Sequence, residues 1–225
     1  MRNLKFLLTL LFIGLFYLLN TYFSEGAFSS IKIDRYDAVV TLDEEGDMTV
    51  VERWDMNYRG DYNVRFRDIV YSKYADNYPL TRSASNVASF DDSSASIRVF
   101  MDDIEVTDDV RFGYSFNNDR DELGYVIACE PYSSSCESLF VDFTDIGGLT
   151  GNVTFEYTYT ILGAVTQYTD ISELNWRLFT YMEADIDEAH VIVNLPDNAL
   201  SEDTIRVWGH GLSDGTINII NNHQI

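Results

Sequence analysis

Apolar and polar residues alternate along much of the chain after residue 30, and this pattern predicts β-strands. In residues 153–161, VTFEYTYTI, a large apolar side chain takes every second position and threonine or glutamate takes the others. Residues 48–58, MTVVERWDMNY, have the same period, and Glu52 is the one charged member of the apolar face. A two-residue period is typical of a strand with one buried and one exposed face. Both segments are therefore predicted to lie in a sheet that covers a core.

A hairpin is predicted at the start of this region. Residues 36–42, YDAVVTL, precede the strand at 48–58, and the turn DEEGD at 43–47 joins the two. Gly46 in this turn can take a backbone conformation that side-chain-bearing residues avoid, which a tight reversal needs. We therefore expect the two segments to pair in antiparallel fashion.

The remaining strands lead to a prediction of fold class. Turn-forming clusters such as NNDRDELG and DIGGLTG separate short candidate strands, and no long amphipathic helix is present in the pattern. We therefore expect an all-β fold, an antiparallel β-sandwich of immunoglobulin-like general architecture. Residues 59–96 have no clear period and are predicted to form a long excursion over the sheet. The other predicted strands are residues 96–101, 105–116, 124–129, 138–143, 175–179, 189–195 and 204–209.

The N-terminal residues have the pattern of an export signal. Arg2 and Lys5 precede an apolar run at residues 6–19 that only Thr9 and Gly14 interrupt. This run is short for a membrane-spanning helix, which needs about 20 residues. Cleavage would remove residues 1–26 as a signal peptide, and retention would leave a signal anchor helix. In both cases residues 27–225 form the predicted extracytoplasmic domain.

Charge narrows the range of partners. The chain carries 37 acidic and 15 basic residues, a formal net charge of −22. Such a field repels polyphosphates, so we expect no nucleic-acid partner. The acidic surface is typical of an exported domain that stays in solution.

Two cysteines, Cys129 and Cys136, stand in the segment CEPYSSSC. Outside the reducing cytosol, such closely spaced cysteines around a turn are predicted to form a disulfide. Closing this short loop should stabilise the domain by roughly 2–3 kcal/mol. A free thiol pair is the alternative, and two thiols with no histidine nearby fall short of the four ligands of a zinc site. We predict no metal site and no cofactor.

Basic residues gather in one part of this acidic chain. We considered two roles for them: ion pairing with the surrounding acidic surface, which we favour, and a pocket for an anionic ligand such as a carboxylate or a wall polymer. The group consists of Arg59, Arg65, Arg67, Lys73 and Arg82.

The segment QYTDISELNW places two carboxylates, Asp170 and Glu173, three residues apart and before Trp176. In a helical turn this spacing fits a capping box, in which each side chain accepts a hydrogen bond from a backbone N–H group. The strand that follows would direct Trp176 into the core. The alternative is a glycosidase-like pair of carboxylates, which requires about 5–10 Å across an open cleft. We favour the structural role and predict no catalytic residue.

The order of these segments resembles a known family. The hairpin at 36–54, YNVRFRDI at 62–69, FEYTYTI at 155–161, YTDISELNW at 168–176 and VIVNLP at 191–196 resemble the extracellular N-terminal domain of predicted bacterial membrane proteins of unknown function, the YciQ-like group. The resemblance covers most of residues 31–196. Its motif positions are Gly46, Glu52, Arg67, Asp170, Glu173 and Trp176.

The resemblance implies a β-sandwich outside the cytoplasmic membrane, followed by transmembrane helices. No second apolar span follows residue 26, so we expect either a chain cut short at its C-terminal end or a free exported domain. The expected function is a non-enzymatic sensor or interaction domain at a bacterial cell surface, with an unidentified protein or cell-wall ligand. It would be attached to the membrane by the signal anchor or by missing C-terminal helices. The alternative is a carboxylate-dependent carbohydrate-active or wall-modifying enzyme that uses Asp170 and Glu173.

Overall fold

The structure, a computed structural model, describes residues 30–71, 88–116, 136–168, 171–176, 178–179, 184–196, 204–209, 215–221 and 223–225. A six-stranded sheet, called the large sheet below, has the order β11-β1-β2-β8-β4-β5, and a three-stranded sheet, the small sheet, has the order β3-β7-β6. The large sheet consists of β1 (Ser30–Leu42), β2 (Met48–Tyr62), β4 (Ser89–Met101), β5 (Ile104–Glu105), β8 (Leu149–Leu162) and β11 (Ala189–Asn194). The small sheet consists of β3 (Val64–Val70), β6 (Arg111–Phe116) and β7 (Cys136–Asp142). The other elements are the paired strands β9 (Thr166–Gln167) and β10 (Ser172–Glu173) and the 3₁₀ helices η1 (Thr107–Asp109) and η2 (Thr144–Ile146).

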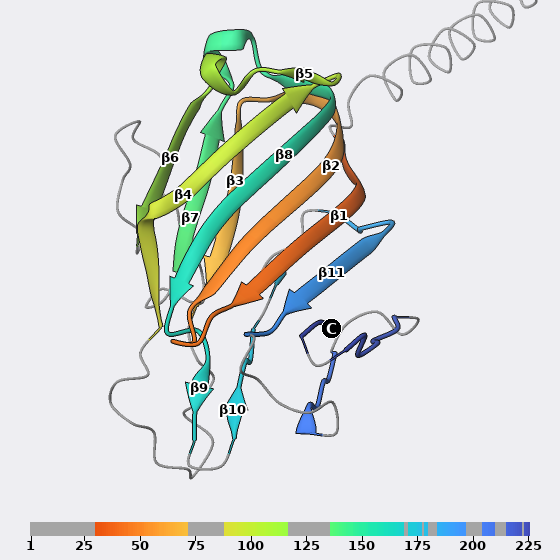
Figure 1. The fold of residues 1–225 in the computed structure, drawn as a ribbon. Helices are drawn as coiled ribbons and strands as arrows, with labels where there is room; N and C mark the ends of the chain where they lie inside the picture. Colours follow the sequence, from red (N-terminus) through yellow and green to blue (C-terminus); the bar gives the residue numbers. More distant parts are fainter. Residues whose placement is uncertain are drawn as a thin grey trace, which may run out of the picture.

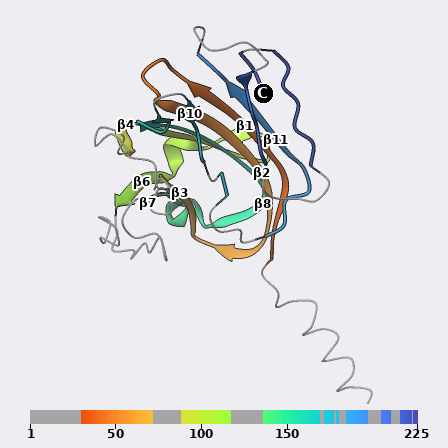
Figure 2. The same cartoon turned by 90° about the horizontal axis from the view of Figure 1, so that it is seen from below.

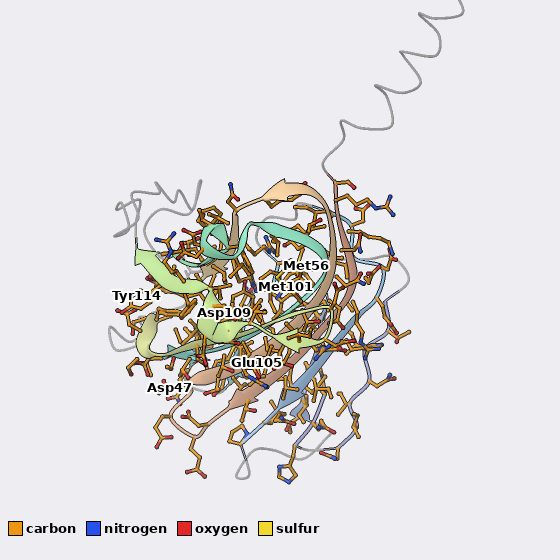
Figure 3. All side chains as sticks on the ribbon, turned by 90° about the horizontal axis from the view of Figure 1, so that it is seen from above. Asp47, Met56, Met101, Glu105, Asp109 and Tyr114 are labelled. Atoms are coloured by element: carbon orange, nitrogen blue, oxygen red, sulfur yellow. The ribbon has the colours of Figure 1, made fainter. Side chains whose placement is uncertain are left out.

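The two sheets face each other across one hydrophobic core. Figure 1 shows the large sheet in front of the small sheet, and Figure 2 shows from below how both curve around the interior. Tyr36 and Phe155 of the large sheet belong to the same buried cluster as Ile69 and Leu139 of the small sheet. Side chains fill this interior in Figure 3, where buried Met56 is labelled. The predicted all-β fold is confirmed.

The predicted hairpin is confirmed as β1 and β2. These strands pair in antiparallel fashion from Ser30 opposite Arg59 to Leu42 opposite Met48. Gly46 in the connecting turn has φ +86°, a left-handed conformation that glycine takes without strain. The five apolar side chains of the segment 153–161 are all buried, as their alternation predicts.

Two adjacent corners carry the chain from one sheet to the other. β2 passes through Asn63 into β3, and β7 passes through η2 into β8. The Phe143 N–H donates to the Asn63 carbonyl at 2.7 Å, which joins the corners. Gly148 has φ +96°, and a Cβ there would lie 3.2 Å from the Tyr62 carbonyl oxygen, so this corner requires glycine. As a result, β2 lies beside β8 in the large sheet and β3 lies beside β7 in the small sheet.

The structure corrects the prediction of a purely antiparallel arrangement. β11 pairs in parallel with β1, with Tyr36 opposite Ala189 and Thr41 opposite Asn194. A parallel neighbour needs a long crossover connection, and residues 43–188 lie between the end of β1 and the start of β11. The alternation of residues 189–195 predicts the strand but not its direction.

Several predicted strand boundaries also change. Residues 105–116 are not one strand, because η1 interrupts them between β5 and β6 as the chain leaves the large sheet. The stretch 59–96 contains the end of β2, all of β3 and the start of β4, and its residues 72–87 lie outside the described part. The described residues of 175–179 and 204–209 form no strand, and residues 124–129 are not described.

Candidate functional site

The motif residues Glu52 and Arg67 meet inside the sandwich. Glu52 lies in the middle of β2, and its side chain shares the inner face with Val50 and Trp54 because side chains of a strand alternate between faces. Arg67 lies on β3 and faces the interior between Arg65 and Ile69. The side chains of Glu52 and Arg67 are 0% and 5% exposed. The corner after β2 brings them together, since it folds β3 back over β2.

Their geometry is that of a forked ion pair. Arg67 Nε donates to Glu52 Oε1 at 2.6 Å, and Arg67 Nη2 donates to Glu52 Oε2 at 3.0 Å. The Tyr36 hydroxyl donates to Glu52 Oε2 at 2.9 Å. Hydrogen bonds to an ionised carboxylate with this planar arrangement are among the strongest in proteins. The buried charge of Glu52 is therefore compensated by one cation and one neutral donor.

Arg67 also fixes a loop against the core. Its Nη2 donates to the Leu178 carbonyl at 2.8 Å, and its Nη1 donates to the Asp68 carbonyl at 2.6 Å. The Phe179 ring lies edge-on to Tyr36, with ring centroids 4.8 Å apart. One guanidinium thus connects β2, β3 and the residues that follow β10.

Trp54 lies against two arginines. The guanidinium carbons of Arg67 and Arg65 are 5.3 Å and 5.8 Å from its ring centroid, within the range of a cation–π contact. Arg65 is also buried, whereas Arg59 is exposed on β2. The predicted basic group is therefore divided, with Arg65 and Arg67 in the interior and Arg59 at the surface. Lys73 and Arg82 lie outside the described residues. Arg67 does form an ion pair, but with buried Glu52 and not with the acidic surface that the prediction named.

The surroundings hold these groups in one protonation state. Burial alone would lower the pKa of Arg67, but the negative charge of Glu52 raises that pKa well above its ordinary value. Burial, with a smaller contribution from Glu52, raises the pKa of Tyr36 well above 10. Both groups therefore keep their protons at neutral pH. This favours a structural role over proton transfer.

The segment with the predicted carboxylate pair has a different conformation from the one expected. Glu173 lies on β10, opposite Thr166 of β9, and its exposed Oε2 accepts a hydrogen bond from the Tyr168 hydroxyl at 3.2 Å. The capping-box interpretation is wrong for Glu173, because cross-strand pairing with β9 holds it in extended backbone. Asp170 lies outside the described residues, so its distance from Glu173 stays open. Trp176 packs against the core, as predicted.

The structure describes one of the two cysteines. Cys136 is the first residue of β7 and is fully buried. Cys129 lies outside the described residues. The disulfide between them stays a prediction.

Glu137 is a second buried carboxylate, which no sequence pattern singled out. It is 1% exposed on β7, and its Oε1 has no hydrogen-bond partner in the described part of the chain. Burial, with a contribution from Asp92, raises the pKa of Glu137 to about 7. Leu139 and Val141, on the same side of β7, belong to the core, but Phe140 interrupts the two-residue alternation that could have indicated an inward direction from the sequence.

The outer face of the large sheet carries a second set of ion pairs. At one register across the sheet, Arg53 on β2 lies opposite Glu156 on β8, which lies opposite Arg98 on β4. Glu156 accepts from Arg53 Nη1 at 3.1 Å and from Arg98 Nη1 at 3.0 Å. His190 on β11 extends this row and is exposed. The charged row consists of His190, Asp37, Arg53, Glu156 and Arg98.

Neither a metal-binding cluster nor a membrane-spanning helix is present among the described residues. They contain no group of three or more histidine, cysteine, aspartate or glutamate side chains that could hold a metal ion. Among the same residues, no helix has both the length and the apolar character needed to cross a membrane.

Comparison with known families identifies the chain. The model of the N-terminal domain of predicted membrane proteins, DUF2207, matches residues 32–225. The chain belongs to this family. The match confirms the resemblance to a predicted membrane protein family and extends it to residue 225.

Individual proteins add little to the family match. No curated protein matches the chain. A crystal structure described as a "putative protease" from Parabacteroides distasonis ATCC 8503 is 15% identical, with a TM-score of 0.37. The match covers 74% of this chain and 29% of that one, so this chain spans under a third of its length. This likeness is too low to support an argument about fold or activity.

Proposed function

We propose that the chain is a non-enzymatic sensor or interaction domain that a bacterial membrane protein displays outside the cytoplasmic membrane. The observation that carries the proposal is the burial of the Glu52–Arg67 pair. These motif residues neutralise each other in the interior, and Tyr36 and Leu178 occupy further hydrogen-bonding positions around them. Their role is to join the two sheets. This leaves surface side chains for contact with a ligand.

The outer face of the large sheet is the surface that best fits such a role. Three apolar residues lie side by side on β11, β1 and β2, namely Ile192, Val39 and Val51. On each of these strands, the apolar residue is two positions away from the member of the charged row. All three are exposed, at 39%, 39% and 47%. Apolar side chains bordered by charged ones are typical of protein interfaces. The partner would be a protein or a cell-wall ligand that covers this face.

Binding to isolated cell envelopes tests the interaction role. The purified chain with Val39→Glu and Val51→Glu should bind envelopes more weakly than the wild type, because two buried charges would oppose contact. The matched control is Ile104→Glu, which changes another exposed apolar residue, on β5. Circular dichroism should show the same sheet content in all three proteins. Equal binding by all three would refute this surface.

A hydrolysis assay tests the enzyme alternative. The wild type should release no sugar from peptidoglycan or other cell-wall glycans. If it does, and if a fully folded Asp170→Asn or Glu173→Gln variant loses that activity, the chain is a carboxylate-dependent enzyme. That result would overturn the proposed function.

A further inference from the structure

Exposed apolar side chains gather near the C-terminal end of the chain. Trp208 is 77% exposed, and Ile217, Ile219 and Ile220 are 49%, 41% and 61% exposed. These four residues are called the C-terminal apolar patch below. Single exposed apolar residues are ordinary, but several together indicate a contact surface.

A contact between Gly209 and Ile217 brings the segment of Trp208 against that of the isoleucines. A Cβ at Gly209 would lie 2.8 Å from Ile217 Cδ1, so the residue next to Trp208 lies directly against Ile217. The following residues are attached to the large sheet, since the N–H of Leu195 donates to the His223 carbonyl at 2.8 Å. Figures 1 and 2 both show the C-terminal residues beside β11. The patch is therefore attached to the folded domain at the β11 edge.

The segment that carries the patch differs in charge from the rest of the chain. Residues 204–225 contain one arginine, Arg206, and one aspartate, Asp214, whereas the whole chain has a net charge of −22. An acidic surface is repelled by anionic lipid headgroups, but a segment without net charge is not. Tryptophan favours the boundary between acyl chains and headgroups, where its ring is buried and its N–H group stays hydrated.

We propose that the C-terminal apolar patch rests on a lipid bilayer, with Trp208 in the interfacial region. The chain belongs to a family of predicted membrane proteins, so a bilayer would lie close to the domain. The proposal deepens the proposed function and rests on it only for the position of the domain outside the membrane. It gives the domain an orientation, because the β11 edge of the large sheet would face the lipid.

Fluorescence quenching by lipid tests this orientation. The full chain is reconstituted into phosphatidylcholine vesicles with or without brominated acyl chains, and Trp208→Phe is prepared in the same way. The difference between the two proteins isolates Trp208, because Trp54 and Trp176 are present in both. We expect bromine to remove most of the Trp208 emission and its maximum to lie at a shorter wavelength than in vesicle-free protein.

A tryptophan at another exposed site provides the matched control. Ile104 is 68% exposed on β5, at the opposite edge of the large sheet from β11. Ile104→Trp in the Trp208→Phe background should keep its emission on brominated vesicles. Unquenched Trp208, or equal quenching at both positions, would overturn the proposal. A concentration-dependent dimer that shields Trp208 without lipid would also overturn it and assign the patch to a second copy. None of these results depends on envelope binding through Val39 and Val51, so the two proposals fail separately.

Discussion

The interior and the outer face of the large sheet contain ion pairs of the same chemistry in opposite surroundings. Glu52 and Arg53 are consecutive residues of β2, so their side chains point to opposite faces. Glu52 pairs with Arg67 in the interior, whereas Arg53 pairs with Glu156 at the surface, where its side chain is 43% exposed. Water can replace the partner of a surface charge but not of a buried one. The distance between charged atoms therefore does not by itself set the energetic role of an ion pair.

Removal of the cation inside the sandwich should have the largest effect. Arg67→Met leaves Glu52 charged, buried and paired only with the Tyr36 hydroxyl. We expect the free energy of unfolding to fall by about 3–5 kcal/mol, as for other broken buried pairs. Urea denaturation followed by circular dichroism would measure it.

A double variant distinguishes the cost of an unpaired charge from lost packing. Glu52→Gln combined with Arg67→Met should destabilise less than the sum of the single variants, because no isolated charge remains. Additive losses would show that the two side chains act independently. A loss below about 1 kcal/mol for Arg67→Met would place the pair in the same energetic class as surface pairs.

Substitution of Glu137 measures how a buried carboxylate without an arginine partner changes stability with pH. Its pKa is about 7 in the folded protein and 4.5 ordinarily, so the folded state favours the protonated form. The resulting stability is complete below about pH 4.5 and is lost as the pH rises to about 7, a decrease of about 2–4 kcal/mol. Glu137→Gln should remove this decrease. Thermal melts from pH 4 to pH 8 would measure the difference, and an unchanged pH profile would contradict the shifted pKa.

Substitution of Tyr36 measures how much the neutral hydrogen-bond donor contributes to the stability of the buried pair. Tyr36→Phe removes the hydroxyl that donates to Glu52 while keeping the ring against Trp54 and Phe179. Loss of a hydrogen bond to a charged group should lower the free energy of unfolding by about 1.5–3 kcal/mol. Chemical denaturation would measure it, and no change would mean that the guanidinium alone satisfies Glu52.

The outer face should give the smallest effect. Arg98 donates to Glu105 and Glu156, and its side chain is 55% exposed. Arg98→Ala should cost less than about 1 kcal/mol, and high salt should reduce this cost further because exposed charges are screened. Denaturation at low and high salt would measure both. A loss as large as that of Arg67→Met would remove the distinction between the two faces.

The sequence predicted one half of the buried pair better than the other. Glu52 interrupts a clear apolar face in residues 48–58, so its inward direction could be inferred from alternation alone. Arg67 lies in the stretch 59–96, which has no clear period because two inner positions of β3 are arginines. Only the family resemblance selected Arg67 as a motif residue. Its contact with Glu52 could not be derived from local pattern, since it depends on the corner at Asn63.

Local sequence is enough to predict the strands whose inner faces are apolar, above all β2 and β8, and the glycine turn between β1 and β2. Those features follow from local geometry, the two-residue period of a strand and the φ angle open to glycine. Only the tertiary structure decided the parallel direction of β11, the extended conformation of Glu173 and the pairing of Glu52 with Arg67. Each depends on which distant segment supplies the neighbouring backbone or charge. That choice is made by the free energy of the whole packed core.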